Sequence, residues 1–184
     1  MEYVYRNQFK LPDLDILILG SDMVKAQDFK TLTDRFDQSM RIINSYGVTE
    51  ATIDSSFYET SMGGECTGDN VPIGSPLPNV HMYVLSQTDQ IQPIGVAGEL
   101  CIGGAGVAKG YHHKPDLTQM KFTENPFVSG ERLYRTGDRA CWLPNGTIRL
   151  LGRMDYQVKI NGYRIETEEI ESVLLQTGLV REAA

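Results

Sequence analysis

Apolar and polar positions in the first third of the chain predict a strand, a helix and a second strand. Residues 14–20 (LDILILG) are an apolar run ended by glycine, which is typical of a strand buried on both faces. In residues 25–36, large apolar side chains recur every three or four positions among polar ones, which predicts a surface helix. Residues 41–46 (RIINSY) predict the second strand, and we expect both strands to pair in parallel as one β-α-β unit.

After about residue 70 the pattern changes to short alternating segments between turns that contain glycine or proline. Residues 80–85 (VHMYVL) and 98–102 (GELCI) are examples, and they predict antiparallel strands. The Pro-Asn-Gly sequence at residues 144–146 predicts a hairpin, because asparagine and glycine tolerate positive φ angles. Residues 157–165 predict two short paired strands, and residues 166–175 predict a helix with acidic residues in its first turn.

These elements predict a mixed α/β fold in three parts. A β-α-β piece of a parallel sheet comes first, a β-rich region follows, and two short strands with a helix come last. The first and last parts would each leave an apolar face uncovered. We therefore expect the chain to be a slice of a larger protein.

Composition and charge exclude several classes of function. The 184 residues are 41% hydrophobic and carry 17 basic and 24 acidic side chains, a net charge of −7 without a basic patch, so we expect no nucleic-acid partner. The apolar runs are too short to cross a bilayer and the N-terminus does not resemble a signal peptide, so we expect a cytoplasmic protein without a membrane partner. Three widely spaced cysteines predict neither a disulfide framework nor a zinc site.

Residues 44–50 (NSYGVTE) follow the second predicted strand, at the end of a sheet where open α/β folds bind ligands. The Tyr46 ring offers a face for stacking a base, and Gly47 allows close approach of the backbone. The Thr49 hydroxyl can donate to a phosphate, and the Glu50 carboxylate can bind Mg²⁺. These residues alone also fit a turn in which Thr49 and Glu50 only cap the next helix.

Three further stretches carry candidate chemistry. The glycine-rich residues 98–111 (GELCIGGAGVAKGY) lack the P-loop pattern and indicate tight turns between strands rather than a phosphate cradle. In residues 134–138 (YRTGD), Asp138 fits either a ribose-binding carboxylate or an Asx turn. Residues 152–165 (GRMDYQVKINGYRI) supply cations that fit either a phosphate ligand or a solvated hairpin.

Together, these stretches resemble the core motifs of adenylation domains of nonribosomal peptide synthetases, within the adenylate-forming, AMP-binding superfamily. NSYGVTE is similar to N-x-Y-G-P-T-E, and GELCIGGAGVAKGY to G-E-L-x-I-x-G-x-G-V-A-R-G-Y. YRTGD is similar to Y-[RK]-T-G-D, and residues 152–166 to G-R-x-D-x-Q-V-K-I-R-G-x-R-I-E. The order and spacing agree over nearly the whole chain, although Val48 replaces proline, Asn161 replaces arginine and Leu150 stands where an aromatic residue is common.

The resemblance implies activation of an amino acid by ATP and Mg²⁺, followed by transfer of the acyl group to the phosphopantetheine thiol of a carrier protein. Peptidyl carrier and condensation domains of the same synthetase are the implied partners. Residues 1–70 would end the α/β subdomain of the core, residues 71–154 would form its β-rich, distorted-barrel subdomain, and residues 155–184 would begin the small α+β C-terminal domain. The family's phosphate loop would lie before Met1 and its catalytic lysine after Ala184, so we expect the isolated chain to be inactive.

The resemblance also implies roles for individual residues. Asp155 would be the hinge of the small domain, and Glu50 would be the Mg²⁺ ligand. The residues implied in catalysis are Thr49, Glu50 and Lys159. The residues implied in nucleotide binding are Ser21, Asp22, Asn44, Ser45, Tyr46, Gly47, Asp138 and Arg153.

The amino-acid pocket implied by the resemblance is lined by Ile18, Gly20, Ser45, Ile53 and Asp54. Small residues leave depth, the isoleucines suit a methylene stem, and the Asp54 carboxylate suits a terminal ammonium group. The combination resembles ornithine-activating domains of Bacillus-type synthetases, so ornithine is our first hypothesis and lysine our second.

Two alternatives remain open from the sequence. One is an acyl- or aryl-CoA ligase of the same superfamily, which would use a carboxylate without the α-amine and free CoA. The other is a non-catalytic interaction module that has kept the nucleotide residues without using them.

Overall fold

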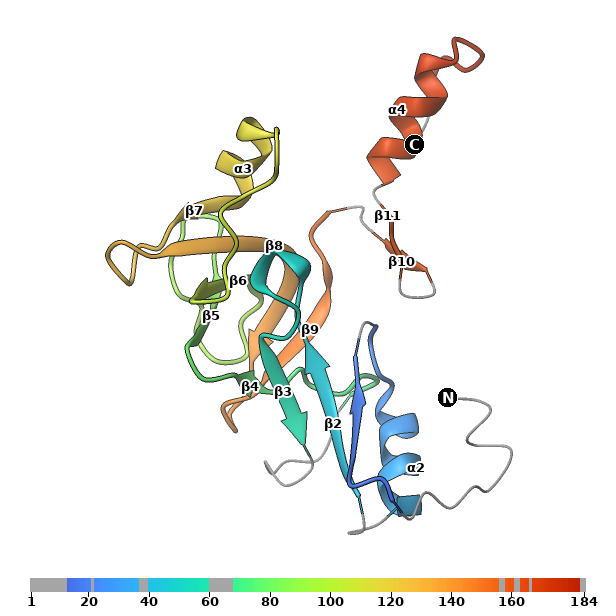
Figure 1. The fold of residues 1–184 in the computed structure, drawn as a ribbon, viewed down its shortest axis with the longest axis vertical. Helices are drawn as coiled ribbons and strands as arrows, with labels where there is room; N and C mark the ends of the chain where they lie inside the picture. Colours follow the sequence, from blue (N-terminus) through green and yellow to red (C-terminus); the bar gives the residue numbers. More distant parts are fainter. Residues whose placement is uncertain are drawn as a thin grey trace.

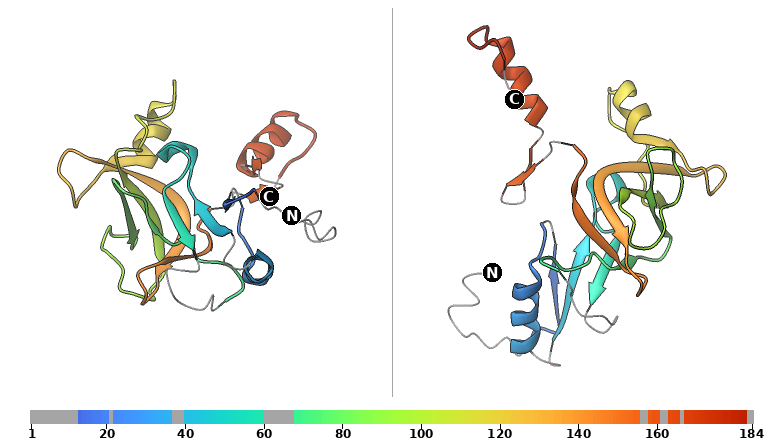
Figure 2. Two further views of the ribbon diagram at one scale, coloured as in Figure 1. Left: turned by 60° about the horizontal axis from the view of Figure 1, so that its bottom comes forward. Right: turned by 180° about the vertical axis from the view of Figure 1, so that it is seen from behind.

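The computed structural model describes residues 13–20, 22–36, 40–59, 68–155, 158–160, 163–165 and 167–182. Figure 1 shows two sheets beside one another, and a hairpin followed by a helix that extends away from them toward the C-terminus. The views in Figure 2 show the same separation from two other directions. The predicted mixed α/β class is therefore confirmed.

The first sheet contains the predicted β-α-β unit. Strand β1 (Ile16–Leu19) pairs in parallel with β2 (Arg41–Tyr46), and α2 (Ala26–Phe36) connects them. The helix begins with an acid and ends with a base in its terminal turns, which complements its dipole, and buries its apolar face against the sheet. Two antiparallel strands, β3 (Ser56–Glu59) and β4 (Ser75–Pro76), complete the order β1-β2-β3-β4.

Burial of β1 differs from the prediction. Leu19 is buried against α2, but Ile16 and Ile18 are 42% and 60% exposed. The prediction of a strand buried on both faces is therefore wrong within the described residues. The physical reason is that side chains alternate along a strand: Leu17 and Leu19 face α2, whereas Ile16 and Ile18 lie on the opposite face, which stays exposed.

The second sheet is antiparallel and centres on a long strand, β8 (Arg132–Trp142). One edge of β8 pairs with β6 (Gly98–Gly104), which in turn pairs with β5 (Val80–Leu85). The other edge pairs first with β7 (Phe122–Glu124) and then with β9 (Ile148–Arg153). The predicted hairpin is confirmed, because β8 and β9 pair antiparallel around residues 144–146.

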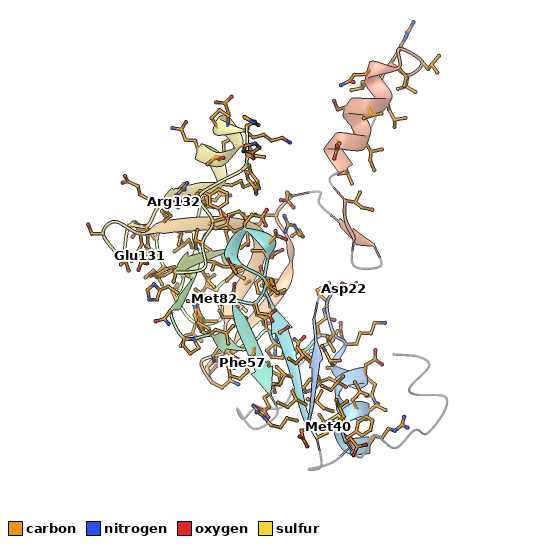
Figure 3. All side chains as sticks on the ribbon, in the orientation of Figure 1. Asp22, Met40, Phe57, Met82, Glu131 and Arg132 are labelled. Atoms are coloured by element: carbon orange, nitrogen blue, oxygen red, sulfur yellow. The ribbon has the colours of Figure 1, made fainter. Side chains whose placement is uncertain are left out.

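A hydrophobic core joins the two sheets. Backbone hydrogen bonds connect Ile73 to Ile148 and Ile148 to Gly74, at 2.8 Å each. The core beside them contains Met82, labelled in Figure 3, and Leu100, together with other side chains from both sheets. This core is what fixes the end of β2 against β8 and β9.

The remaining elements lie outside these sheets. Helix α3 (Pro115–Lys121) precedes β7, and the turn η2 (Thr49–Ala51) follows β2. Strands β10 (Val158–Ile160) and β11 (Tyr163–Ile165) pair antiparallel and lead into α4 (Thr167–Gln176), as predicted.

Candidate functional site

A cavity of about 500 Å³ lies at the carboxyl end of β2, where the first sheet meets β8 and β9. Asp22, labelled in Figure 3, lies just beyond the end of β1 and is one of the residues that line the cavity. The carboxyl ends of parallel strands are the usual ligand position of open α/β sheets. The lining residues are Asp22, Met23, Val24, Asn44, Ser45, Tyr46, Gly47, Asn70, Val71, Ile73, Asp138, Leu150, Gly152, Arg153 and Asp155.

A chain of polar contacts connects residues that line the cavity. The Tyr46 hydroxyl donates to Oδ2 of Asp138, and Nη1 of Arg153 donates to Oδ1 of the same carboxylate at 2.9 Å. Nε and Nη2 of Arg153 also donate to the two carboxylate oxygens of Asp155, at 2.6 and 2.5 Å. One guanidinium therefore connects the predicted ribose-binding residue to the predicted hinge residue.

Burial and charge fix the protonation states of this chain of contacts. Burial, followed by the negative charge of Asp138, raises the pKa of Tyr46 well above its ordinary value, so the phenol stays neutral and donates. Burial by itself lowers the pKa of Arg153, but the contacts with Asp155 and Asp138 outweigh it, and the pKa is raised. Arg153 therefore stays charged in the cavity.

The sequence YRTGD forms a bulge in β8 at the edge of the cavity. The β6–β8 pairing places Cys101 opposite Arg135 and Glu99 opposite Arg139, so one β6 residue faces three β8 residues. Within the bulge the Thr136 hydroxyl donates to the Leu100 carbonyl at 2.7 Å and accepts from the N–H of Asp138 at 2.9 Å. The bulge turns the Asp138 carboxylate toward Tyr46 and Arg153.

Gly137 is required in this bulge for two reasons. Its φ angle is +73°, which strongly favours glycine. A Cβ atom at this position would also lie 2.6 Å from Oδ2 of Asp155 and 2.8 Å from Nη2 of Arg153. The missing side chain leaves the space that the Arg153–Asp155 ion pair occupies.

The segment after β2 is held by the glycine-rich stretch. Gly47 passes so close to Ile53 that a Cβ atom would overlap the Ile53 carbonyl oxygen. Glu50 is 7% exposed, and its Oε1 accepts a hydrogen bond from the Tyr111 hydroxyl at 2.7 Å. Its backbone carbonyl accepts from the N–H of Ala108 at 2.9 Å. Two residues of the 98–111 stretch thus hold Glu50 in place through its side chain and its backbone.

The predicted site residues divide into three groups. Asp22, Asn44, Ser45, Tyr46, Gly47, Asp138, Arg153 and Asp155 lie around one cavity. Thr49, Glu50, Ile18, Gly20, Ile53 and Asp54 are not among its lining residues. Ser21 lies outside the described residues, and only the backbone of Lys159, in β10, is described.

Some members of the second group lie close to residues that line the cavity. A Cβ atom on Gly20 would lie 2.8 Å from Oγ of Ser45, and one on Gly47 would lie 2.6 Å from Cα of Asp54. Ile53 is 76% exposed, and Asp54 is also exposed. Of this group, Gly20 therefore lies against the lining residue Ser45, and Asp54 lies against the lining residue Gly47.

Sequence reasoning missed several contributors. The apolar lining residues Val24, Val71 and Ile73 carry no local signal, because they come from connecting segments that only the tertiary fold brings together. Tyr111 did carry a signal, because it is the last residue of the glycine-rich motif. Packing of that motif against NSYGVTE would have suggested its contact with Glu50.

Comparison with known proteins identifies the family. Residues 2–112, more than half of the chain, match the model described as AMP-binding enzyme. The chain belongs to the AMP-binding enzyme family. A curated relative, gramicidin S synthase 2 of Brevibacillus brevis, is 56% identical over 183 residues, which cover 100% of this chain and 4% of the relative. The predicted resemblance to peptide-synthetase adenylation domains is therefore confirmed.

Solved structures of the family have the same fold. An NRPS protein with adenylation and PCP domains, bound to a vinylsulfonamide inhibitor, has a TM-score of 0.84 and 31% identity, covering 93% of this chain and 30% of that one. The Vibrio cholerae adenylation domain AlmE, in complex with glycyl-adenosine-5'-phosphate, has a TM-score of 0.78 and 29% identity, covering 95% of this chain and 34% of that one. The chain thus spans about a third of these solved structures.

None of the helices in the described part of the chain is long and apolar enough to cross a membrane.

Proposed function

We propose that this chain forms part of an adenylation domain that makes an aminoacyl-adenylate from ATP and an amino acid. The observation that carries the proposal is the single cavity that unites Tyr46, Asp138 and Arg153 at the carboxyl end of β2. The AlmE structure with glycyl-adenosine-5'-phosphate supports this chemistry, because it is a relative in complex with an aminoacyl nucleotide.

In this proposal the cavity binds the nucleotide. The Tyr46 ring forms a flat wall, and Asp138 accepts hydrogen bonds from the ribose hydroxyls. Each carboxylate oxygen has two lone pairs, so Asp138 can accept a ribose hydroxyl while it still binds Tyr46 and Arg153. The charge of Arg153 attracts the phosphates, and Asp22, Asn44, Ser45 and Gly47 line the base. By resemblance, the same role in nucleotide binding is proposed for Ser21.

Thr49, Glu50 and Lys159 complete the proposed chemistry. Mg²⁺ binds proteins through one or two carboxylates together with substrate phosphates, and the buried Glu50 carboxylate suits that donor set. When bound, the ion would neutralise phosphate charge during displacement at the α-phosphate. Thr49 would contact a phosphate, and Lys159 would approach the nucleotide from beyond the Asp155 hinge.

The proposal extends to partners and organisation. The adenylate would pass its acyl group to the phosphopantetheine thiol of a peptidyl carrier domain, and a condensation domain of the same synthetase would use the product. The structure with adenylation and PCP domains in one chain supports a carrier partner. We keep the division into residues 1–70, 71–154 and 155–184, and place the reaction in the cytoplasm, where ATP is available.

For the substrate we propose ornithine, with lysine second. Ile18, Ile53 and Asp54 are exposed in the described structure, so their side chains are available to a ligand. Gly20 and Ser45, both small, lie against each other. Apolar side chains for a methylene stem and a carboxylate for a terminal ammonium group fit a basic amino acid.

The test is amino-acid-dependent ATP–pyrophosphate exchange by a complete adenylation domain that contains this sequence. The panel includes ornithine, lysine, leucine, glutamate and aryl acids, and we expect exchange to peak with ornithine. Asp54→Asn should raise KM for ornithine about tenfold, the loss of one charge-assisted hydrogen bond, and leave KM for a neutral amino acid such as leucine unchanged. Asp34→Asn on α2, an exposed aspartate, is the matched control.

The other outcomes separate the alternatives. Exchange that peaks with a neutral amino acid would keep the reaction but contradict the pocket assignment. Exchange with an aryl acid, followed by transfer to free CoA, would identify a CoA ligase. An absence of exchange with every acid would favour the non-catalytic module.

A further inference from the structure

The glycine-rich motif carries a carboxylate that bonds, from the neighbouring strand, to the turn before Asp138. Glu99 lies on β6, beside β8 in Figure 1, and its side chain is 12% exposed. Its Oε1 accepts the N–H of Gly137 at 3.1 Å, and its Oε2 accepts from Nη2 of Arg135 at 2.6 Å. Neither the sequence motifs nor the proposed function assigns a role to this residue.

The bulge in β8 explains why a side chain is needed at this point. Three β8 residues face a single β6 residue between the Cys101–Arg135 and Glu99–Arg139 pairs. Two successive N–H groups in the bulge therefore bond to side chains, that of Gly137 to Glu99 and that of Asp138 to the Thr136 hydroxyl. A backbone N–H without an acceptor would be costly in this partly buried position.

The turn held by Glu99 determines where the proposed ribose ligand lies. Gly137 directly precedes Asp138, and its carbonyl accepts the N–H of Met154 at 2.8 Å. The space above Gly137 contains the guanidinium of Arg153 and the carboxylate of Asp155. A shift of Gly137 would therefore move Asp138 and the ion pair together.

Glu99 is itself held in place by charge. Arg135 donates to Glu99 through Nη2 and to Asp89 through Nη1, the second bond at 2.7 Å. Hydrogen bonds between charged groups are shorter and stronger than neutral ones, so this arrangement orients the Glu99 carboxylate. Its second oxygen is then directed at the Gly137 N–H.

We propose that Glu99 is a positioning residue for nucleotide recognition: it fixes the Gly137 turn and thereby aims the Asp138 carboxylate at the ribose hydroxyls. The inference rests on the proposed function, in which Asp138 binds the ribose. It predicts that loss of Glu99 weakens recognition of the ribose hydroxyls more than recognition of the rest of the nucleotide.

The experiment compares KM for ATP with KM for 2′,3′-dideoxy-ATP in pyrophosphate exchange by the complete adenylation domain. The preference for ATP should fall roughly fivefold to tenfold in Glu99→Ala, the size of one hydrogen bond, with KM for the amino acid unchanged. Glu99→Gln keeps an acceptor oxygen for Gly137 and should retain part of the preference. Glu59→Gln is the matched control and should have no effect, because it removes a carboxylate on β3 that pairs with Arg41 on β2.

Asp138→Asn separates failure of the inference from failure of the proposed function. If Asp138→Asn keeps the full preference for ATP, the proposed ribose role is wrong. The positioning role is overturned if Asp138→Asn loses the preference for ATP while Glu99→Ala keeps it. It is also overturned if Glu99→Ala raises KM for ATP and for 2′,3′-dideoxy-ATP by the same factor. If Glu99→Ala does not fold, Glu99→Gln and Arg135→Gln take its place, and an unchanged preference in both would equally overturn it.

Discussion

Replacing Gly137 with alanine tests whether the turn before Asp138 is built around the Arg153–Asp155 ion pair. The new Cβ atom would lie 2.6 Å from Oδ2 of Asp155 and 2.8 Å from Nη2 of Arg153, so the two side chains must move apart. The φ angle of +73° adds backbone strain. We expect both stability and nucleotide affinity to fall.

The magnitude follows from two separate contributions. A left-handed backbone costs a residue other than glycine roughly 1–2 kcal/mol. Displacing the partly exposed ion pair adds up to about 1 kcal/mol. Because Arg153 also holds Asp138, the same displacement should weaken ATP binding about fivefold, which corresponds to about 1 kcal/mol.

Gly146→Ala is the matched control, because Gly146 has a φ angle of +77° and nothing within 4 Å of an added Cβ atom. Both variants are made in the complete adenylation domain, with urea unfolding for stability and pyrophosphate exchange for KM of ATP. Gly137→Ala should be the less stable of the two, and only Gly137→Ala should raise KM. Equal stability and equal KM in both variants would refute the proposed packing of the ion pair on Gly137.

Three further predictions concern buried groups of the same domain. Tyr46→Phe removes the hydroxyl that donates a hydrogen bond to Asp138. It should lower the free energy of unfolding, measured by urea denaturation, by about 1–2 kcal/mol. Phe29→Ala empties a site that is 1% exposed beside Tyr58 and should cost about 3–5 kcal/mol, whereas Met120→Ala, 69% exposed, should change the unfolding midpoint little. Burial, followed by the charge of Glu99, raises the pKa of Cys101 to about 12, so iodoacetamide should not label it in the folded state at pH 8, as mass spectrometry would show. As the pH rises, the Cys101 thiol loses its proton in the unfolded chain before it does so in the folded one. The stability contributed by the buried neutral thiol is therefore complete below about pH 9 and is lost as the pH rises toward 12. Cys101→Ala should reduce this loss of stability at high pH.

Local patterns predicted most of the elements correctly. The alternation in residues 80–85 matches β5, and the Pro-Asn-Gly turn joins β8 to β9. The helical spacing in residues 25–36 matches α2, whose apolar side chains are buried. Burial of β1 could not be predicted in the same way, because every residue of this strand is apolar and the sequence does not show whether one or both of its faces are covered.

The sequence alone determined the types of functional group at the site and the family to which they point. Tyr46, Asp138 and Arg153 were all named from their motifs, because an aromatic ring, a carboxylate and a guanidinium each have recognisable chemistry. It also indicated that these residues come from separate segments of the chain.

Only the tertiary structure decided how these groups meet. The same guanidinium contacts Asp138 and Asp155, and Glu99 supports the Gly137 turn before Asp138 from another strand. These contacts depend on a bulge in the β6–β8 register and on the space above Gly137. Side-chain types are written in the sequence, but register and close approach arise only when distant strands pack together, which is why the connections within this site came from the fold.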